Sequence, residues 1–153
     1  QRTPFVMAHS RLIVCERSNH WAVAIRWALA ECGVRVHETR TWTDCWQQLE
    51  TSPASFLAVE LRKSNLAEMV QRLSDLRWFF PQSAAVVMAT DDLRQYQTRY
   101  EWTLREAGAL HLVSSRRNLT PIAQLATRFF GKTTRPEENF RDSVWDRLPW
   151  QAD

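Results

Sequence analysis

Five short, mostly apolar runs alternate with segments of helical periodicity, and this alternation constrains the fold more than any other feature of the chain. In chain order the runs are Leu12–Cys15, Val34–Glu38, Ser55–Glu60, Ala84–Ala89 and Leu110–Val113. Continuous apolar strands that alternate with helices are typical of a parallel sheet covered on both faces. We therefore predict an α/β domain with a five-stranded parallel sheet between helical layers.

Capping residues indicate where the intervening helices start and end. The expected starts, in chain order, are Ser18, Thr41, Asn65, about Asp92, and Thr120. Side chains of these types accept hydrogen bonds from the free N–H groups of a first helical turn. Gly33, Gly108 and Gly131 each follow a helical pattern, and we predict that each of them ends a helix.

The residues that carry common enzyme chemistry are missing or scattered. No strand is followed by a glycine-rich turn, so the chain has neither a dinucleotide-binding fingerprint nor a phosphate-binding loop. The histidines are isolated and no Cys-x-x-Cys spacing occurs, so we expect no metal site and no cofactor. Cys15, Cys32 and Cys45 lie in apolar surroundings, and we expect them to be buried free thiols in a reducing cytoplasm.

The length of 153 residues fits one domain. We expect that domain over residues 11–131, after an N-terminal extension over residues 1–10. Residues 132–153 are predicted to form a linker and a short amphipathic helix with Phe140, Val144 and Leu148 on one side. No stretch approaches the roughly 20 apolar residues of a membrane span, so no membrane contact is expected.

Residues 11–131 resemble the receiver domain of bacterial response regulators, the CheY-like family. The segments that carry the resemblance are Leu12–Arg17, Glu31–Val36, Phe56–Glu60, Val86–Thr90 and Glu106–Ala109. Glu60 lies 27 residues after Gly33, which is the usual spacing in the family between this glycine and the phosphoacceptor aspartate. The resemblance implies a flavodoxin-like, three-layer fold with strand order 2-1-3-4-5, here with an added C-terminal helical tail.

The resemblance also places a phosphorylation site, and most of its positions are altered. The phosphoacceptor position is Glu60, one methylene longer than aspartate, and the two acids that help to hold Mg²⁺ become Glu16 and Arg17. Thr90 matches the hydroxyl residue of the family, whereas Ser115 stands at the position of its lysine. Because a cation cannot ligate Mg²⁺, we predict a pseudo-receiver that is not an enzyme and is free of metal.

Two interpretations of Glu60 remain open. Its carboxylate could reach toward Thr90 and imitate a phosphorylated aspartate, with Arg17 as the balancing cation in place of a metal. Alternatively, Glu60 is a relic, solvated at the end of a strand. In the first case we expect Arg17 within hydrogen-bond or single-water distance of Glu60.

Exposed tryptophan and arginine residues define a predicted interaction surface, because these types are enriched at binding hot spots. Its members are Arg94, Arg99, Trp102, Arg105, Arg116, Arg117, Trp145 and Trp150. A solvated cationic face is the simpler alternative for the helix that carries Trp102. The two tail tryptophans are expected to be docked on the domain itself, on a second copy or on a partner.

Together these features favour a cytoplasmic, non-catalytic signalling domain that acts by binding a protein partner or a second copy of itself. A nucleic-acid-binding module is one alternative, because the net charge is +3 and 18 of the 20 basic residues are arginine. A working phosphoacceptor receiver with unconventional chemistry is the other.

Overall fold

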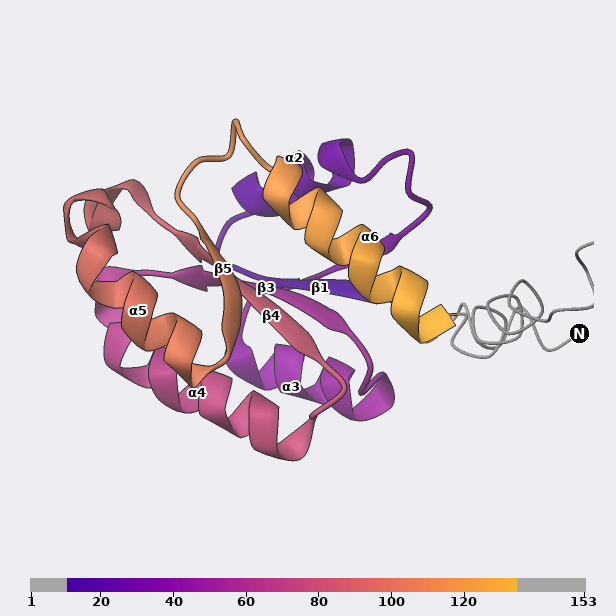
Figure 1. The fold of residues 1–153 in the computed structure, drawn as a ribbon, viewed down its shortest axis with the longest axis horizontal. Helices are drawn as coiled ribbons and strands as arrows, with labels where there is room; N and C mark the ends of the chain where they lie inside the picture. The colour runs from indigo at the N-terminus through magenta and orange to yellow at the C-terminus, as the bar shows by residue number, and fades with distance from the viewer. Residues whose placement is uncertain (1–10, 135–153) are drawn as a thin grey trace, which may run out of the picture.

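The computed structural model describes residues 11–134, which form a three-layer α/β domain (Figure 1). Its five strands are all parallel and lie in the order β2-β1-β3-β4-β5. The strands are β1 (Arg11–Cys15), β2 (Arg35–Thr39), β3 (Phe56–Leu61), β4 (Ala84–Ala89) and β5 (Ala109–Val113). The predicted fold class and strand order are confirmed.

Helices cover both faces of the sheet (Figure 1). On one face lie α2 (His20–Ala28) and α6 (Thr120–Thr134), and on the other lie α3 (Trp42–Thr51), α4 (Leu66–Phe79) and α5 (Gln97–Ala107). Two short 3₁₀ helices, η1 (Lys63–Asn65) and η2 (Asp91–Tyr96), lead into α4 and α5.

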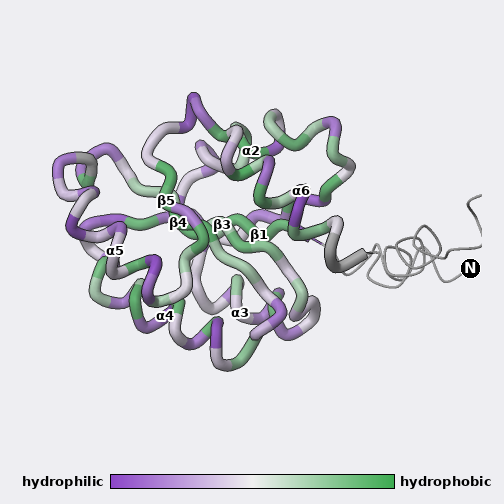
Figure 2. The backbone as a smooth tube through the Cα atoms, viewed as in Figure 1, coloured by the Kyte–Doolittle hydropathy of each residue, from purple (hydrophilic) through white to green (hydrophobic). Residues whose placement is uncertain are grey.

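Two hydrophobic cores explain why the central strands β1, β3 and β4 are apolar at nearly every position. Successive side chains of a strand point to opposite faces, so β1 places Ile13 in the core under α3, α4 and α5. It places Leu12 and Val14 in the core under α2 and α6. Figure 2 shows β1 and β3 as hydrophobic backbone through the centre of the molecule. In these central strands polar side chains are restricted to the strand ends, whereas the edge strands β2 and β5 carry His37 and His111 at their middle positions.

Two helix starts differ from the sequence prediction. The N-cap residue of α2 is Asn19, not Ser18, and its side chain makes no capping hydrogen bond. The helix expected from about Asp92 starts at Gln97, because the preceding six residues form η2. Tighter 3₁₀ turns are common at the start of an α-helix, and a capping pattern in the sequence does not reveal them.

The predicted roles of two glycines are also wrong, whereas Gly108 caps α5 as predicted. Helix α2 ends at Ala28 with Leu29 as its C-cap, so Gly33 lies in the turn beyond the end of the helix. Gly131 lies inside α6, which continues to Thr134. Gly33 and Gly108 have positive φ values of 65° and 125°, the region that favours glycine after a helix, and Gly131 does not. Glycine permits a helix to end but does not force it to end.

The three cysteines differ in exposure. Cys45 is buried, Cys15 is half-buried and Cys32 is exposed, so the expectation of three buried thiols is wrong for Cys32. The reason is its place in the turn after α2, where its Sγ lies 3.7 Å from the Thr127 hydroxyl on α6.

The predicted N-terminal extension and tail lie outside the described residues. This applies to the tail residues Phe140, Val144, Trp145, Leu148 and Trp150. Within residues 11–134, no helix is both long enough and apolar enough to cross a membrane.

We expect Phe56→Ala to lower the free energy of unfolding by about 3–5 kcal/mol. Phe56 is fully buried on β3, and its ring packs against Phe129 and Phe130 of α6 at centroid distances of 5.6 and 6.4 Å. Urea unfolding measures the change. The matched control is Trp78→Ala, at a side chain that is 81% exposed, for which we expect a change within about 0.5 kcal/mol. Equal effects of the two substitutions would contradict this packing.

Candidate functional site

The predicted site residues lie at the carboxyl ends of the strands, where open parallel sheets carry their sites. Glu60 is the fifth residue of β3, Glu16 follows β1 and Thr90 follows β4.

Glu60 lines two hollows. The first, which we call the acceptor cavity, has a volume of about 590 Å³ and is lined by residues that include Glu60, Arg62, Thr90, Asp91, Ser114 and Arg116. The second, the thiol-side cavity, measures about 330 Å³ and is lined by residues that include Cys15, Glu16, Arg17, Glu60, Arg62 and Arg72.

Glu60 is held in an ion pair inside the domain. Its residue is only 7% exposed, and its Oε1 accepts a hydrogen bond from Arg62 Nε at 2.5 Å. The Asn65 amide donates to the Glu60 carbonyl at 3.1 Å and accepts from the Arg62 N–H at 2.7 Å. The loop after β3 is thus closed on itself, with a guanidinium on the acid that occupies the phosphoacceptor position.

Glu60 makes neither a direct ion pair with Arg17 nor a direct hydrogen bond with Thr90, and a separation of one water molecule between Arg17 and Glu60 stays a prediction. Arg17 is exposed, and although both residues line the thiol-side cavity, no ion pair joins them. The Thr90 hydroxyl lies 3.3 Å from the Leu61 carbonyl, and it also contacts the Asp92 carboxylate. Residues two apart in extended chain point to the same side, which gives Arg62 the shorter route to Glu60. The solvated position that the relic alternative gave to Glu60 is wrong, because Glu60 is buried and paired.

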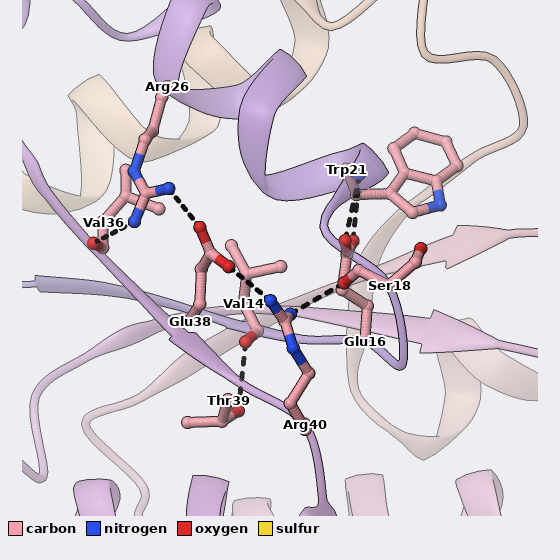
Figure 3. Close-up of polar contacts among 9 residues, drawn as sticks. All are labelled: Val14, Glu16, Ser18, Trp21, Arg26, Val36, Glu38, Thr39 and Arg40. Carbon is pink, nitrogen blue, oxygen red and sulfur yellow. Dashed lines mark hydrogen bonds and ion pairs between the residues drawn. The ribbon is translucent and has the colours of Figure 1, made fainter.

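Glu16 is a second buried carboxylate and caps α2. It is 2% exposed, and its two carboxylate oxygens accept hydrogen bonds from the Trp21 N–H at 3.0 and 3.2 Å (Figure 3). Burial raises the pKa of Glu16 to about 7, and the negative charge of Glu60 adds to this effect. Capping bonds from Ala22 and Trp21 lower the pKa but do not outweigh burial.

Sequence analysis missed an ion-pair network at the edge of the sheet beside Glu16 (Figure 3). Glu38 of β2 pairs with Arg26 of α2 and, at 2.8 Å, with Arg40. Arg40 also donates to the Ser18 carbonyl at 2.7 Å. Burial raises the pKa of Glu38, but hydrogen bonds from the two guanidiniums outweigh it and leave the pKa below its usual value. The network holds the loop of Glu16 and Arg17 against β2.

Ser115 does not take the place of a lysine in the acceptor cavity. Its hydroxyl accepts a hydrogen bond from the Arg117 N–H at 3.2 Å, and it lines a neighbouring hollow of about 670 Å³. The β5–α6 loop contributes Ser114 and Arg116 to the acceptor cavity instead. The cation that this loop contributes to the acceptor cavity is therefore Arg116, one position after Ser115.

The arrangement does not suit the Mg²⁺ that the resemblance implies. Mg²⁺ prefers carboxylate, carbonyl and water oxygens in a near-octahedral shell. Of the two acidic positions, Glu16 is engaged with the first turn of α2, and the other position is Arg17. The carboxylate of Glu60 already carries a guanidinium. Among residues 11–134, no three His, Cys, Asp or Glu side chains gather into a metal-binding group.

The predicted interaction surface is exposed where the structure describes it. Trp102 on α5 is 71% exposed, and Arg99 and Arg105 beside it are also exposed. Arg116 and Arg117 are exposed in the β5–α6 loop, and Arg94 lies in η2. Trp145 and Trp150 lie outside the described residues.

Exposed tryptophan is not confined to that surface. Trp27 on α2 and Trp78 on α4 are each 81% exposed, and sequence analysis had not singled them out. The helical periodicity places Trp102 off the apolar stripe of its helix. It does not indicate which of the three exposed tryptophans binds a partner. Exposure alone therefore does not distinguish the α5 surface.

Comparison with known proteins identifies the fold. No family model matches the sequence, and no curated protein matches it either. Among solved structures, a response regulator from Thermotoga maritima matches with a TM-score of 0.66 and 15% identity, over 80% of this chain and 98% of that one. The chain has the fold of a receiver domain. This confirms the resemblance seen in the sequence.

Two further receiver-fold structures agree with this result. A CheY-like protein, TadZ, from Pseudomonas aeruginosa PAO1 matches with a TM-score of 0.58 and 18% identity, over 76% of this chain and 93% of that one. The beryllofluoride-activated NtrC4 receiver domain dimer matches with a TM-score of 0.63 and 12% identity, over 80% of this chain and 98% of that one. Identities this low show the fold alone.

We expect Glu16→Gln to flatten the pH dependence of stability. Because the pKa of Glu16 is raised from 4.5 to about 7, the folded state binds this proton more tightly than the unfolded chain does. The stability that the proton provides is complete below pH 4.5 and is lost as the pH rises through about 7. For this shift the loss is about 3 kcal/mol.

Urea unfolding at pH 5 and pH 8 measures this loss in the wild-type protein and in the variant. The wild type should lose more stability between the two pH values than Glu16→Gln, whose amide cannot ionise. The control is Glu68→Gln, at a side chain that is 64% exposed, which should keep the wild-type pH dependence. Parallel pH curves for wild type and Glu16→Gln would contradict the raised pKa.

Proposed function

We propose that this chain is a non-catalytic signalling domain with a receiver fold, which acts by binding a protein partner and does not accept a phosphoryl group. The observation that supports this most strongly is the ion pair between Arg62 and Glu60, in which Arg62 Nε lies 2.5 Å from Glu60 Oε1. The pair supplies internally the positive charge that a working receiver obtains from a metal ion.

The chemistry of phosphoryl transfer supports the same conclusion. A carboxylate nucleophile must approach the phosphorus in line, and the charge of the transferred group must be neutralised. Here the carboxylate is longer by one methylene and is bound through Oε1 to Arg62. Arg17 stands where an acid would help to hold the metal. The acceptor position therefore lacks the geometry of aspartate and one of the acids that would help to hold the ion.

A pre-paired acceptor site would keep the domain in one signalling state. In this proposal Glu60 is paired with Arg62, and Arg62 and Asn65 keep the β3–α4 loop closed around it. Regulation then depends on which partner is present and not on phosphorylation. The α5 surface around Trp102 is the proposed contact, and a second copy of the chain is an occupant to test, since one matched structure is a receiver domain dimer.

Incubation with Mg²⁺ and acetyl phosphate should leave the intact mass of the protein unchanged. The reason is that the attacking oxygen of Glu60 is engaged by Arg62 and that no acid stands at the Arg17 position. Intact mass spectrometry gives the result, with an active receiver domain in the same tube as the control for the donor. A gain of about 80 Da that Glu60→Gln abolishes would contradict the proposal and favour a working receiver.

Trp102→Ala should weaken partner binding or self-association, by roughly 30-fold if Trp102 is a hot spot. Sedimentation velocity measures self-association, and affinity capture with purified variants measures partner binding. Trp78→Ala is the matched control, because Trp78 is as exposed but lies on α4. Equal loss in both variants would contradict a contact centred on α5. Binding to oligonucleotides that weakens steeply with salt would instead favour the nucleic-acid alternative.

A further inference from the structure

Two cysteine thiols lie in the core beside the carboxyl end of β1. Cys15 is the last residue of β1, and Cys45 is on α3, the helix that packs across the end of that strand. Cys45 belongs to the core that contains Ile13 and Val59, and Cys15 packs against this core. The two thiols are close enough to affect each other's ionisation, and Thr39, which pairs with Cys15 in the sheet register, also affects both.

The two thiols differ in access. Cys45 is 0% exposed, whereas Cys15 is half-buried and lines the thiol-side cavity. That cavity has a volume of about 330 Å³, which is many times the volume that one water molecule needs. A small molecule in solution can therefore reach Cys15 through the cavity, while Cys45 lies behind it in the core.

Fixed positive charge faces the accessible thiol. Arg72 of α4 lines the same cavity, where it pairs with Glu68 at 3.0 Å and lies over the Trp42 ring with its Cζ 5.2 Å from the ring centroid. Arg17 and Arg62 line this cavity as well. Reactive cysteines occur in such electropositive and partly exposed surroundings.

The two thiols are also unequal as acids. The hydrogen bond from Cys45 lowers the pKa of Cys15, burial opposes this, and Thr39 and the charge of Arg72 lower it further, against the charge of Glu60. The same hydrogen bond and burial raise the pKa of Cys45. Cys15 is thus the better nucleophile of the pair, and Cys45 keeps its proton.

We propose that Cys15 and Cys45 form an oxidisable dithiol, in which Cys15 reacts with a hydroperoxide and Cys45 resolves the product. The Cys15 thiolate attacks one oxygen of hydrogen peroxide, the O–O bond breaks, and Cys15 sulfenic acid and hydroxide form. The Cys45 sulfur then attacks the sulfenic sulfur while its proton passes to the leaving hydroxide, the S–O bond breaks, and a disulfide and water form. The two sulfur atoms lose two electrons, which reduce the peroxide.

This oxidation would act on the candidate site without phosphorylation. A Cys15–Cys45 bond ties α3 to the residue that directly precedes Glu16 and Arg17. The proposal does not depend on the partner-binding function, since the chemistry needs only the two thiols and a peroxide.

The test uses a Cys32→Ser background, which removes the exposed third thiol. After treatment with hydrogen peroxide, the intact mass should fall by two hydrogen atoms, and peptide mapping without reductant should join the peptides of Cys15 and Cys45. Dithiothreitol should restore the mass. With Cys45→Ser or Cys45→Ala, Cys15 sulfenic acid should persist and react with dimedone. With Cys15→Ser, Cys45 should stay reduced.

A second comparison tests the role of charge. Arg72→Met should slow the oxidation of Cys15 by roughly 3- to 10-fold, because less thiolate forms without the guanidinium. Arg105→Met is the matched control, since Arg105 makes the same kind of ion pair one helical turn from its glutamate, but on α5. The proposal is overturned if Cys15 stays reduced in peroxide, if Cys15→Ser is oxidised at Cys45 as fast, or if both arginine variants slow equally.

Discussion

Burial of both faces of the sheet is the constraint on which the rest of the structure depends. Because α2 and α6 cover one face and α3, α4 and α5 cover the other, the central strands β1, β3 and β4 accept almost only apolar side chains. In these strands polar chemistry is left to the ends, where Glu16 and Glu60 lie almost fully buried. The candidate site depends on how those two carboxylates are compensated.

The two acids are compensated in different ways. Glu60 is paired with a guanidinium from its own loop. Glu16 accepts hydrogen bonds from backbone N–H groups in the first turn of α2, and its pKa rises to about 7 because burial outweighs these bonds and the charge of Arg40. Glu16 is therefore a group that gains or loses its proton near neutral pH, whereas Glu60 is held by an ion pair. Neither arrangement leaves a carboxylate free for a metal ion.

Several of the arginines, although scattered in the sequence, form ion pairs in the folded domain. Several arginines compensate buried or half-buried acids: Arg62 pairs with Glu60, and Arg26 and Arg40 pair with Glu38. Arg72 instead pairs with an exposed acid and carries its charge beside the thiols. This division separates arginines that stabilise the carboxyl end of the sheet from the exposed arginines of α5, of which Arg105 pairs with Glu101 of the same helix.

The sequence by itself determined the sheet, its strand order through the receiver resemblance, and the position of Glu60, because apolar periodicity and chain spacing are local properties. It also placed Glu16, Arg17 and Thr90 at one edge. Only the tertiary structure decided which cation pairs with Glu60, that Glu16 caps α2, and that Cys15 meets Cys45. These contacts depend on side-chain direction at the ends of strands and on the packing of α3, and neither leaves a periodic trace in the sequence.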